Sequence, residues 1–133
     1  MNARLIYAAS EHAANLFYAT RFFAPDPFLY LQEAEGGTTH LCTTALEVDR
    51  ARRTARVDQV HDWADLRAQS KAIFPQRILD ETSLIVFFLK QLGIREVEGP
   101  ASFPLGLARQ LDELGIKVEP VPDPFWPQRS IKT

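Results

Sequence analysis

Leu89-Lys90-Gln91-Leu92-Gly93-Ile94-Arg95 is a seven-residue pattern that returns later in the chain as Leu111-Asp112-Glu113-Leu114-Gly115-Ile116-Lys117. In each copy apolar residues at helical spacing lead to a glycine, which ends a helix because it adopts the left-handed conformation at little cost. A strand-like run follows each glycine, Arg95 to Glu98 in the first copy and Lys117 to Val121 in the second. The pattern predicts two helix-to-strand units, and successive strand-helix-strand units favour parallel pairing through right-handed crossovers.

The two helices of these units differ in their apolar faces. Asp80 is placed to cap the first, whose buried stripe is predicted at Leu84, Ile85, Phe88, Leu89 and Leu92. Val86 and Phe87 widen that stripe almost to a full circumference, so this helix must be covered on two sides. Pro104 lies near the first turn of the second helix, whose buried face is predicted at Leu107, Ala108, Leu111 and Leu114.

The first half of the chain predicts a strand at Leu5 to Ala9, a short helix from Ser10 through Ala14, and a hairpin. The hairpin joins strands at Phe28–Gln32 and 39–44 through the turn 35–38, which contains two glycines. Further elements are expected as a surface helix at Leu46–Ala55, a strand at Arg56–Trp63, and a helix from Asp62 or Trp63 to Ala72. Together these elements predict an α/β fold of three α/β/α layers, with a mixed, mostly parallel sheet.

The composition is that of an ordinary globular domain. The 133 residues are 46% hydrophobic and 24% charged, with a formal net charge of -2, so no nucleic-acid or membrane partner is expected. Cys42 is the single cysteine, which excludes an intramolecular disulfide and a zinc site built from several thiolates. The first residues lack the pattern of a signal peptide, and no apolar run approaches about 20 residues, so a cytoplasmic location is expected.

Several polar residues have spacings that resemble sites but favour structural roles. His40 and Cys42 lie two apart on a predicted strand and so face the same side, as a buried histidine and thiol commonly do. Asp58, His61 and Asp62 suggest metal ligands, yet Asp58 and His61 would face opposite sides of a strand. We therefore expect neither a metal site nor a catalytic residue in this chain.

Basic residues also gather on the predicted surface helix, at Arg50, Arg52, Arg53 and Arg56. Glu47, Asp49 and Asp58 neutralise much of this charge, so a solvated helix face is favoured over a phosphate-binding patch.

One corner suggests a function. Arg21, Phe22, Phe23 and Asp26 lie on a segment stiffened by Pro25, where an arginine beside aromatic residues suits subunit contact or the mouth of a substrate site. The alternative is that Phe22 and Phe23 close the end of the sheet. Phe125 and Trp126, in a proline-rich stretch too apolar for a free tail, are predicted to contact another domain.

Four stretches of the chain resemble the N-terminal domain of the creatinase, prolidase and Xaa-Pro aminopeptidase family, through their order and spacing. Asn15–Phe22 resembles a family pattern that ends in threonine-glycine-phenylalanine, with Arg21 where glycine is usual. Pro25–Leu29 resembles the strand that follows, and Leu46–Ala51 resembles the helix after the hairpin. Residues 103–108, 123–125 and 129–132 resemble the family's last helix and its joint to a catalytic domain.

The resemblance implies a ribonuclease-H-like domain at 1–127, followed at 128–133 by the start of a linker to a C-terminal catalytic domain that lies outside this sequence. It implies a non-catalytic domain of a metal-dependent Xaa-Pro dipeptidase or aminopeptidase, which supports a homodimer and shapes access of peptide substrates to a neighbouring subunit. Two divalent metals are expected in the catalytic domain, and no cofactor is expected in this chain.

Two other functions remain open from the sequence. The first is a stand-alone module that binds a small ligand or a protein without peptidase activity. The second is an enzyme in its own right that uses Cys42 or His61.

Overall fold

The computed structural model describes residues 3–9, 14–76 and 80–122. Its elements are, in chain order, β1 (Ala3–Ala8), α1 (Ala14–Thr20), β2 (Phe28–Gln32), β3 (Thr39–Thr43), α2 (Ala45–Thr54), β4 (Gln59–Asp62), α3 (Trp63–Ile73), α4 (Glu81–Gln91), β5 (Glu96–Pro100), α5 (Leu105–Glu113) and β6 (Lys117–Val121).

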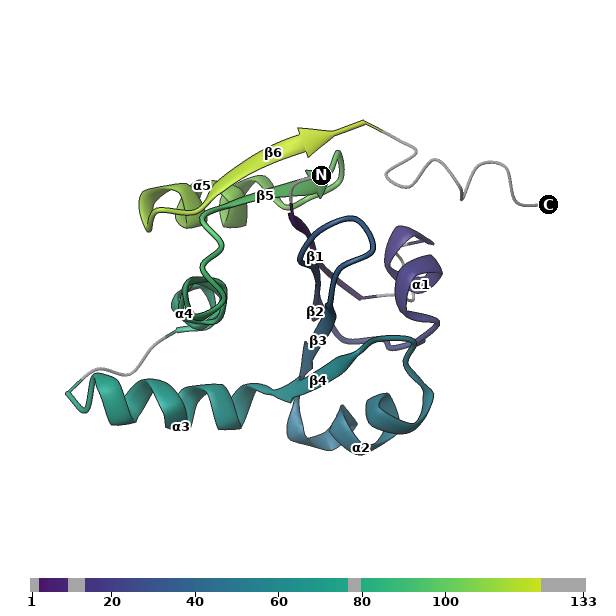
Figure 1. Cartoon of the computed structure of the whole chain (residues 1–133), viewed down its shortest axis with the longest axis horizontal. Coiled ribbons are helices and arrows are strands. Elements are labelled where there is room, and N and C mark those ends of the chain that lie inside the picture. Colours follow the sequence, from purple (N-terminus) through teal and green to yellow (C-terminus); the bar gives the residue numbers. More distant parts are fainter. Residues whose placement is uncertain (1–2, 10–13, 77–79, 123–133) are drawn as a thin grey trace.

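All six strands belong to one mixed sheet, in the order β4-β3-β2-β1-β5-β6. The hairpin strands pair antiparallel, as does β1 with β2, whereas β3/β4, β1/β5 and β5/β6 pair parallel. Figure 1 shows the sheet between two layers, with α3, α4 and α5 on one side and α1 and α2 on the other. The predicted three-layer architecture with a mixed, mostly parallel sheet is therefore confirmed.

Alternation along the strands divides the core into two parts. In β2, Leu29 and Leu31 face the α3, α4 and α5 layer, while Phe28 and Tyr30 face α1 and α2. Successive side chains of a strand point to opposite faces, so a strand buried on both sides is apolar throughout. Burial of each large apolar side chain contributes roughly 1.5–3 kcal/mol, which makes the two cores the main source of stability.

The repeated pattern forms two identical helix ends. At α4, the Gly93 N–H donates to the Lys90 carbonyl at 3.0 Å and the Ile94 N–H donates to the Leu89 carbonyl at 2.9 Å, with φ of 75° at Gly93. This pair of bonds is a Schellman motif. It recurs at the end of α5, where Gly115 has φ of 97° and Ile116 reaches back to Leu111 at 2.8 Å. Each motif turns the chain into a parallel strand, as the sequence predicted.

Two aspartates begin helices on the α3–α4 side. The Asp80 side chain accepts from the Ser83 N–H at 2.8 Å, and this bond holds the pKa of Asp80 below its ordinary value. Asp62 accepts from the Ala64 N–H at 2.9 Å and starts α3. The predicted cap at Asp80 is confirmed.

Three expectations differ from the structure. The first helix continues to Thr20, beyond the predicted end at Ala14, and carries Leu16 into the core; residues 10–13, where most of the predicted helix falls, lie outside the described part. The strand expected at Arg56–Trp63 is shortened to Gln59–Asp62, since the Asp62 cap starts a helix at Trp63. Leu114 is 42% exposed instead of buried, because it lies at the turn of the Schellman motif.

Among the described residues, no helix has the length and hydropathy needed to span a membrane.

Candidate functional site

The corner between α1 and β2 has an unusual backbone. Arg21 has φ of 53° and is the one non-glycine residue in the left-handed region among the described residues. Its N–H donates to the Phe17 carbonyl at 2.7 Å, which closes the last turn of α1. A helix end of this kind usually carries glycine, because a Cβ disfavours the left-handed conformation.

Buried side chains stabilise the left-handed turn at Arg21, a position where a helix end usually has glycine. The Thr20 hydroxyl donates to the Leu16 carbonyl at 2.9 Å and accepts from the Phe22 N–H at 3.1 Å. Phe22 is 1% exposed, and its ring meets Phe28 edge-on at 5.3 Å between centroids. The Arg50 guanidinium covers the Phe22 ring at 4.2 Å from its centroid. Phe22 is therefore a core residue that positions its exposed neighbours.

The outer side of the corner carries aromatic and charged groups. Phe23 is 56% exposed and meets Phe17 edge-on at 6.3 Å, while the Arg21 guanidinium lies 5.5 Å from the centre of the Tyr18 ring. Asp26 is also exposed. We call Phe17, Tyr18, Arg21 and Phe23 the aromatic corner. The sequence singled out Arg21 and Phe23, and it missed Phe17 and Tyr18, whose helical spacing to Arg21 was a usable signal.

A second group of polar residues lies inside the sheet. His40 is 2% exposed, and its Nε2 lies 2.7 Å from Oε2 of Glu33. Its other ring nitrogen, Nδ1, lies 3.0 Å from Nε2 of His61 on the neighbouring strand β4. Phe88 of α4 packs edge-on against both imidazoles, at 5.5 Å from His40 and 5.0 Å from His61. We call Glu33, His40 and His61 the histidine chain.

Burial governs the electrostatics around the histidine chain. Desolvation lowers the pKa of His61, and a positive charge on His40, when it is protonated, and the charge of Arg52 act in the same direction. Burial also raises the pKa of the Cys42 thiol far above its usual range, so this cysteine is a neutral core residue and not a nucleophile.

The structure resolves the polar residues that resembled sites. His40 and Cys42 face the same side of β3, as predicted, since His40 packs against Phe88 and Cys42 belongs to the core beneath α4. Asp58 precedes β4 and accepts from the Thr39 N–H at 2.8 Å, while Asp62 caps α3. In the described ranges no three His, Cys, Asp or Glu side chains come together as metal ligands.

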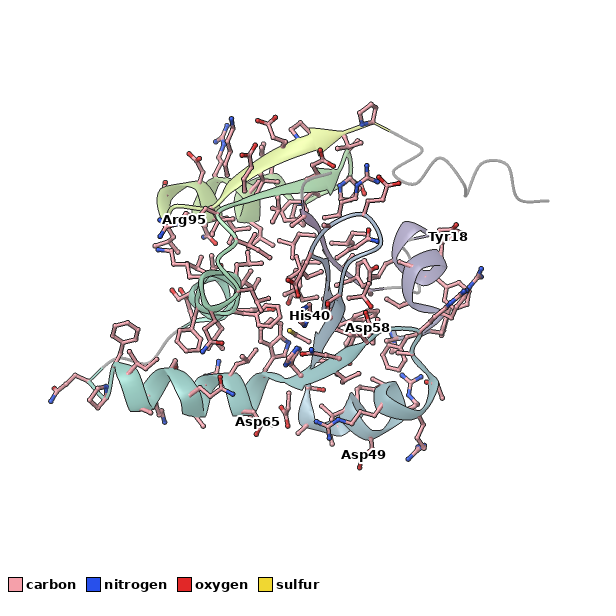
Figure 2. The ribbon with its side chains drawn as sticks, in the orientation of Figure 1. Tyr18, His40, Asp49, Asp58, Asp65 and Arg95 are labelled. Atoms are coloured by element: carbon pink, nitrogen blue, oxygen red, sulfur yellow. The ribbon has the colours of Figure 1, made fainter. Side chains whose placement is uncertain are left out.

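The remaining predicted residues do not form a single site. Arg50 pairs with Glu47 and covers Phe22, while Arg52, Arg53 and Arg56 are exposed, which agrees with a solvated helix face. Figure 2 shows Tyr18 of the aromatic corner on the outside of α1, whereas His40 lies in the interior. Phe125 and Trp126 lie outside the described residues.

Comparison with known proteins gives a consistent result at the level of structure alone. The sequence matches no family profile and no curated protein. Among solved structures, 91% of the chain superposes on an X-Pro aminopeptidase from Thermotoga maritima (TM-score 0.65, 15% identity, 31% of that chain). It superposes equally widely on the Xaa-Pro aminopeptidase from Streptococcus thermophilus (TM-score 0.59, 13% identity, 79% of that chain) and the prolidase from Pyrococcus horikoshii (TM-score 0.59, 18% identity, 28% of that chain).

The match therefore spans less than a third of the Thermotoga and Pyrococcus chains. At these identities the likeness concerns the fold alone. The chain has the fold of the N-terminal domain found in prolidases and Xaa-Pro aminopeptidases.

Proposed function

We propose that this chain is a non-catalytic domain of an Xaa-Pro dipeptidase or aminopeptidase, and that its aromatic corner contacts a neighbouring subunit or its substrate. The observation that supports this proposal most directly is Arg21, a half-buried arginine in a left-handed conformation whose guanidinium lies beside the Tyr18 ring. Strained residues outside glycine gather at functional sites, which gives the outlier a physical meaning.

The chemistry of the corner fits a contact role. Phe17 and Phe23 are 37% and 56% exposed and offer flat apolar area, while an arginine can grip a carboxylate through two parallel hydrogen bonds. Aromatic residues and arginine are also the commonest residues that carry binding energy at protein interfaces. A peptide with a free carboxylate, or an acidic residue of a second subunit, would suit this surface.

We place the two divalent metals of the proposed reaction in another part of a longer protein. In this proposal the catalytic partner is the chain's own C-terminal domain, and the assembly is a cytoplasmic homodimer.

The first test compares the chain alone with the product of the complete reading frame, using Xaa-Pro dipeptides and longer Xaa-Pro peptides as substrates. We expect hydrolysis only by the longer protein and only with added divalent metal. Hydrolysis by the chain alone would overturn the proposal.

The second test replaces Arg21 in the longer protein. Arg21→Ala is expected to raise KM about tenfold or more with kcat little changed, because a lost charged hydrogen bond weakens binding by about 1.5–3 kcal/mol. Arg53→Ala, which removes an exposed arginine of α2 away from the corner, is the matched control and should leave KM unchanged. Equal kinetic constants for Arg21→Ala and the wild type would count against a role in substrate access.

One observation favours the alternative of a binding module. A groove of about 400 Å³ lies between α3 and α4, with walls that include Ile73, Phe74, Val86, Phe87 and Leu114. Mostly apolar concave surfaces of this size commonly hold small ligands. A reading frame that ends at Thr133 would favour this alternative over the peptidase domain.

A further inference from the structure

The histidine chain links three successive strands of the sheet. Glu33 follows β2, His40 lies on β3, and His61 lies on β4, which is the last strand at its edge of the sheet. Asp62, the next residue, caps α3, so β4 and α3 are joined without a loop. Any change in the bond between His40 and His61 therefore acts on α3 as well as on β4.

Counting protons gives the direction of each bond for the neutral pair of imidazoles. A carboxylate can only accept, so His40 Nε2 carries a proton and donates it to Glu33. When both imidazoles are neutral, the His40 Nδ1 has a lone pair and accepts from a protonated His61 Nε2. In this neutral arrangement both imidazoles have the same tautomer.

Added protons disturb this arrangement in two steps. The first added proton keeps the bond, because either imidazole can carry the charge while one N–H still lies between His40 Nδ1 and His61 Nε2. A second added proton leaves both rings doubly protonated and places two N–H donors 3.0 Å apart, which removes the bond altogether. Because His40 is 2% exposed, water cannot readily replace the lost partner, and an unsatisfied buried donor is costly.

The surroundings offer little to stabilise a charge on His61. Arg52 of α2 repels it, and Cys42 of β3, the register partner of His61, stays a neutral thiol. Asp62 of β4 is turned to the α3 amide of Ala64, and α4 contributes the uncharged Phe88. Glu33 is the acidic group of the histidine chain, and it contacts His40 on the side away from His61.

We propose that Glu33, His40 and His61 form a proton-sensitive latch, which holds β4 and α3 on the sheet at neutral pH and releases them on mild acidification. Protons bind to the two histidines, and the segment that is released is the edge strand β4 together with α3, the helix that follows it.

The direction of the pH effect follows from linkage. Because folding lowers the pKa of His61, the unfolded chain binds more protons at mildly acidic pH. The contribution of His61 is fully present above its ordinary pKa of about 6.5 and is lost as pH falls toward the lower folded value. This window begins above the range in which carboxylates titrate.

Cys42 provides a local probe of the latch, because it is the single cysteine, is fully buried, and pairs in register with His61. The experiment measures its labelling by a dipyridyl disulfide, relative to the same chain in denaturant at the same pH. We expect protection of Cys42 to fall by up to about tenfold between about pH 7.5 and 5.5, while circular dichroism shows that the remaining fold persists.

His61→Gln keeps an N–H donor for His40 but does not titrate, so its protection should stay the same at both pH values. His12→Gln removes the remaining histidine of the chain and should behave as the wild type. Constant protection in the wild type, an equal fall in His61→Gln, loss of pH dependence in His12→Gln, or loss of the whole circular dichroism signal at about pH 5.5 would each overturn the latch.

A second measurement on the wild type does not depend on a stable variant. Nitrogen-15 spectra of the imidazoles at about pH 7.5 should show the Nε2–H tautomer for both His40 and His61. An Nδ1–H tautomer at His40 would contradict the proposed bond direction.

Discussion

Two helix ends with the same backbone conformation use different residues. α4 ends at Gly93 with φ of 75°, whereas α1 ends at Arg21 with φ of 53°. A Cβ added at Gly93 would meet no atom within 4 Å, so the backbone conformation alone accounts for the glycine. At Arg21 the backbone would favour glycine by about 1 kcal/mol, yet a long charged side chain is present. The difference indicates that the backbone conformation determines the residue at the end of α4, whereas the contacts of the Arg21 side chain determine the residue at the end of α1.

If this comparison is correct, the α1 corner depends on its buried side chains. Phe22→Ala should lower the free energy of unfolding by about 3–5 kcal/mol, because it removes a fully buried ring and leaves a cavity beside Phe28. Urea unfolding followed by circular dichroism measures this change.

Phe23→Ala is the matched control, since its ring is 56% exposed and a surface substitution changes stability by only about 0.5 kcal/mol. Equal losses of stability in Phe22→Ala and Phe23→Ala would show that the burial of Phe22 is not what stabilises the corner.

The fold was predictable where the information is local. The two glycine-ended helices, the Asp80 cap and the hairpin each depend on residues within a few positions of one another, and each is confirmed. The alternation between two buried faces also follows from the strands themselves.

The polar contacts between strands could not be predicted in this way. His40 and His61 are 21 positions apart, and they meet because β4 pairs parallel with β3 in one particular register. No local pattern of residues signals that register, so Asp58, His61 and Asp62 resembled one cluster when they have three separate roles. Phe22 and Phe23 were equally ambiguous, because the turn at Arg21 determines which ring enters the core.

The α4 end can be tested by giving it a Cβ. Gly93→Ala should lower the free energy of unfolding by about 1 kcal/mol, from the left-handed backbone alone, since no atom lies within 4 Å of the added carbon. Chemical denaturation of both proteins measures the difference.

Gly106→Ala, in the same half of the chain, is expected to change the free energy of unfolding in the opposite direction. Gly106 lies inside α5 without a positive φ and also has open space around it, so alanine should stabilise the helix by about 0.5–1 kcal/mol. If Gly106→Ala lowered the free energy of unfolding as much as Gly93→Ala, the effect at Gly93 could not be assigned to its left-handed backbone. The comparison of the two helix ends would then fail.

The smallest expected effect is at Arg21 itself. Arg21→Gly should raise the free energy of unfolding by about 0.5 kcal/mol, because relief of about 1 kcal/mol of backbone strain is partly offset by loss of the contact with Tyr18. Arg21→Ala also loses that contact but keeps the strain, so it should be slightly less stable than the wild type. Both variants lack the guanidinium and should weaken the proposed subunit or substrate contact equally. A glycine variant less stable than the alanine variant would mean that Arg21 is unstrained, and its backbone would then no longer support a role at the surface.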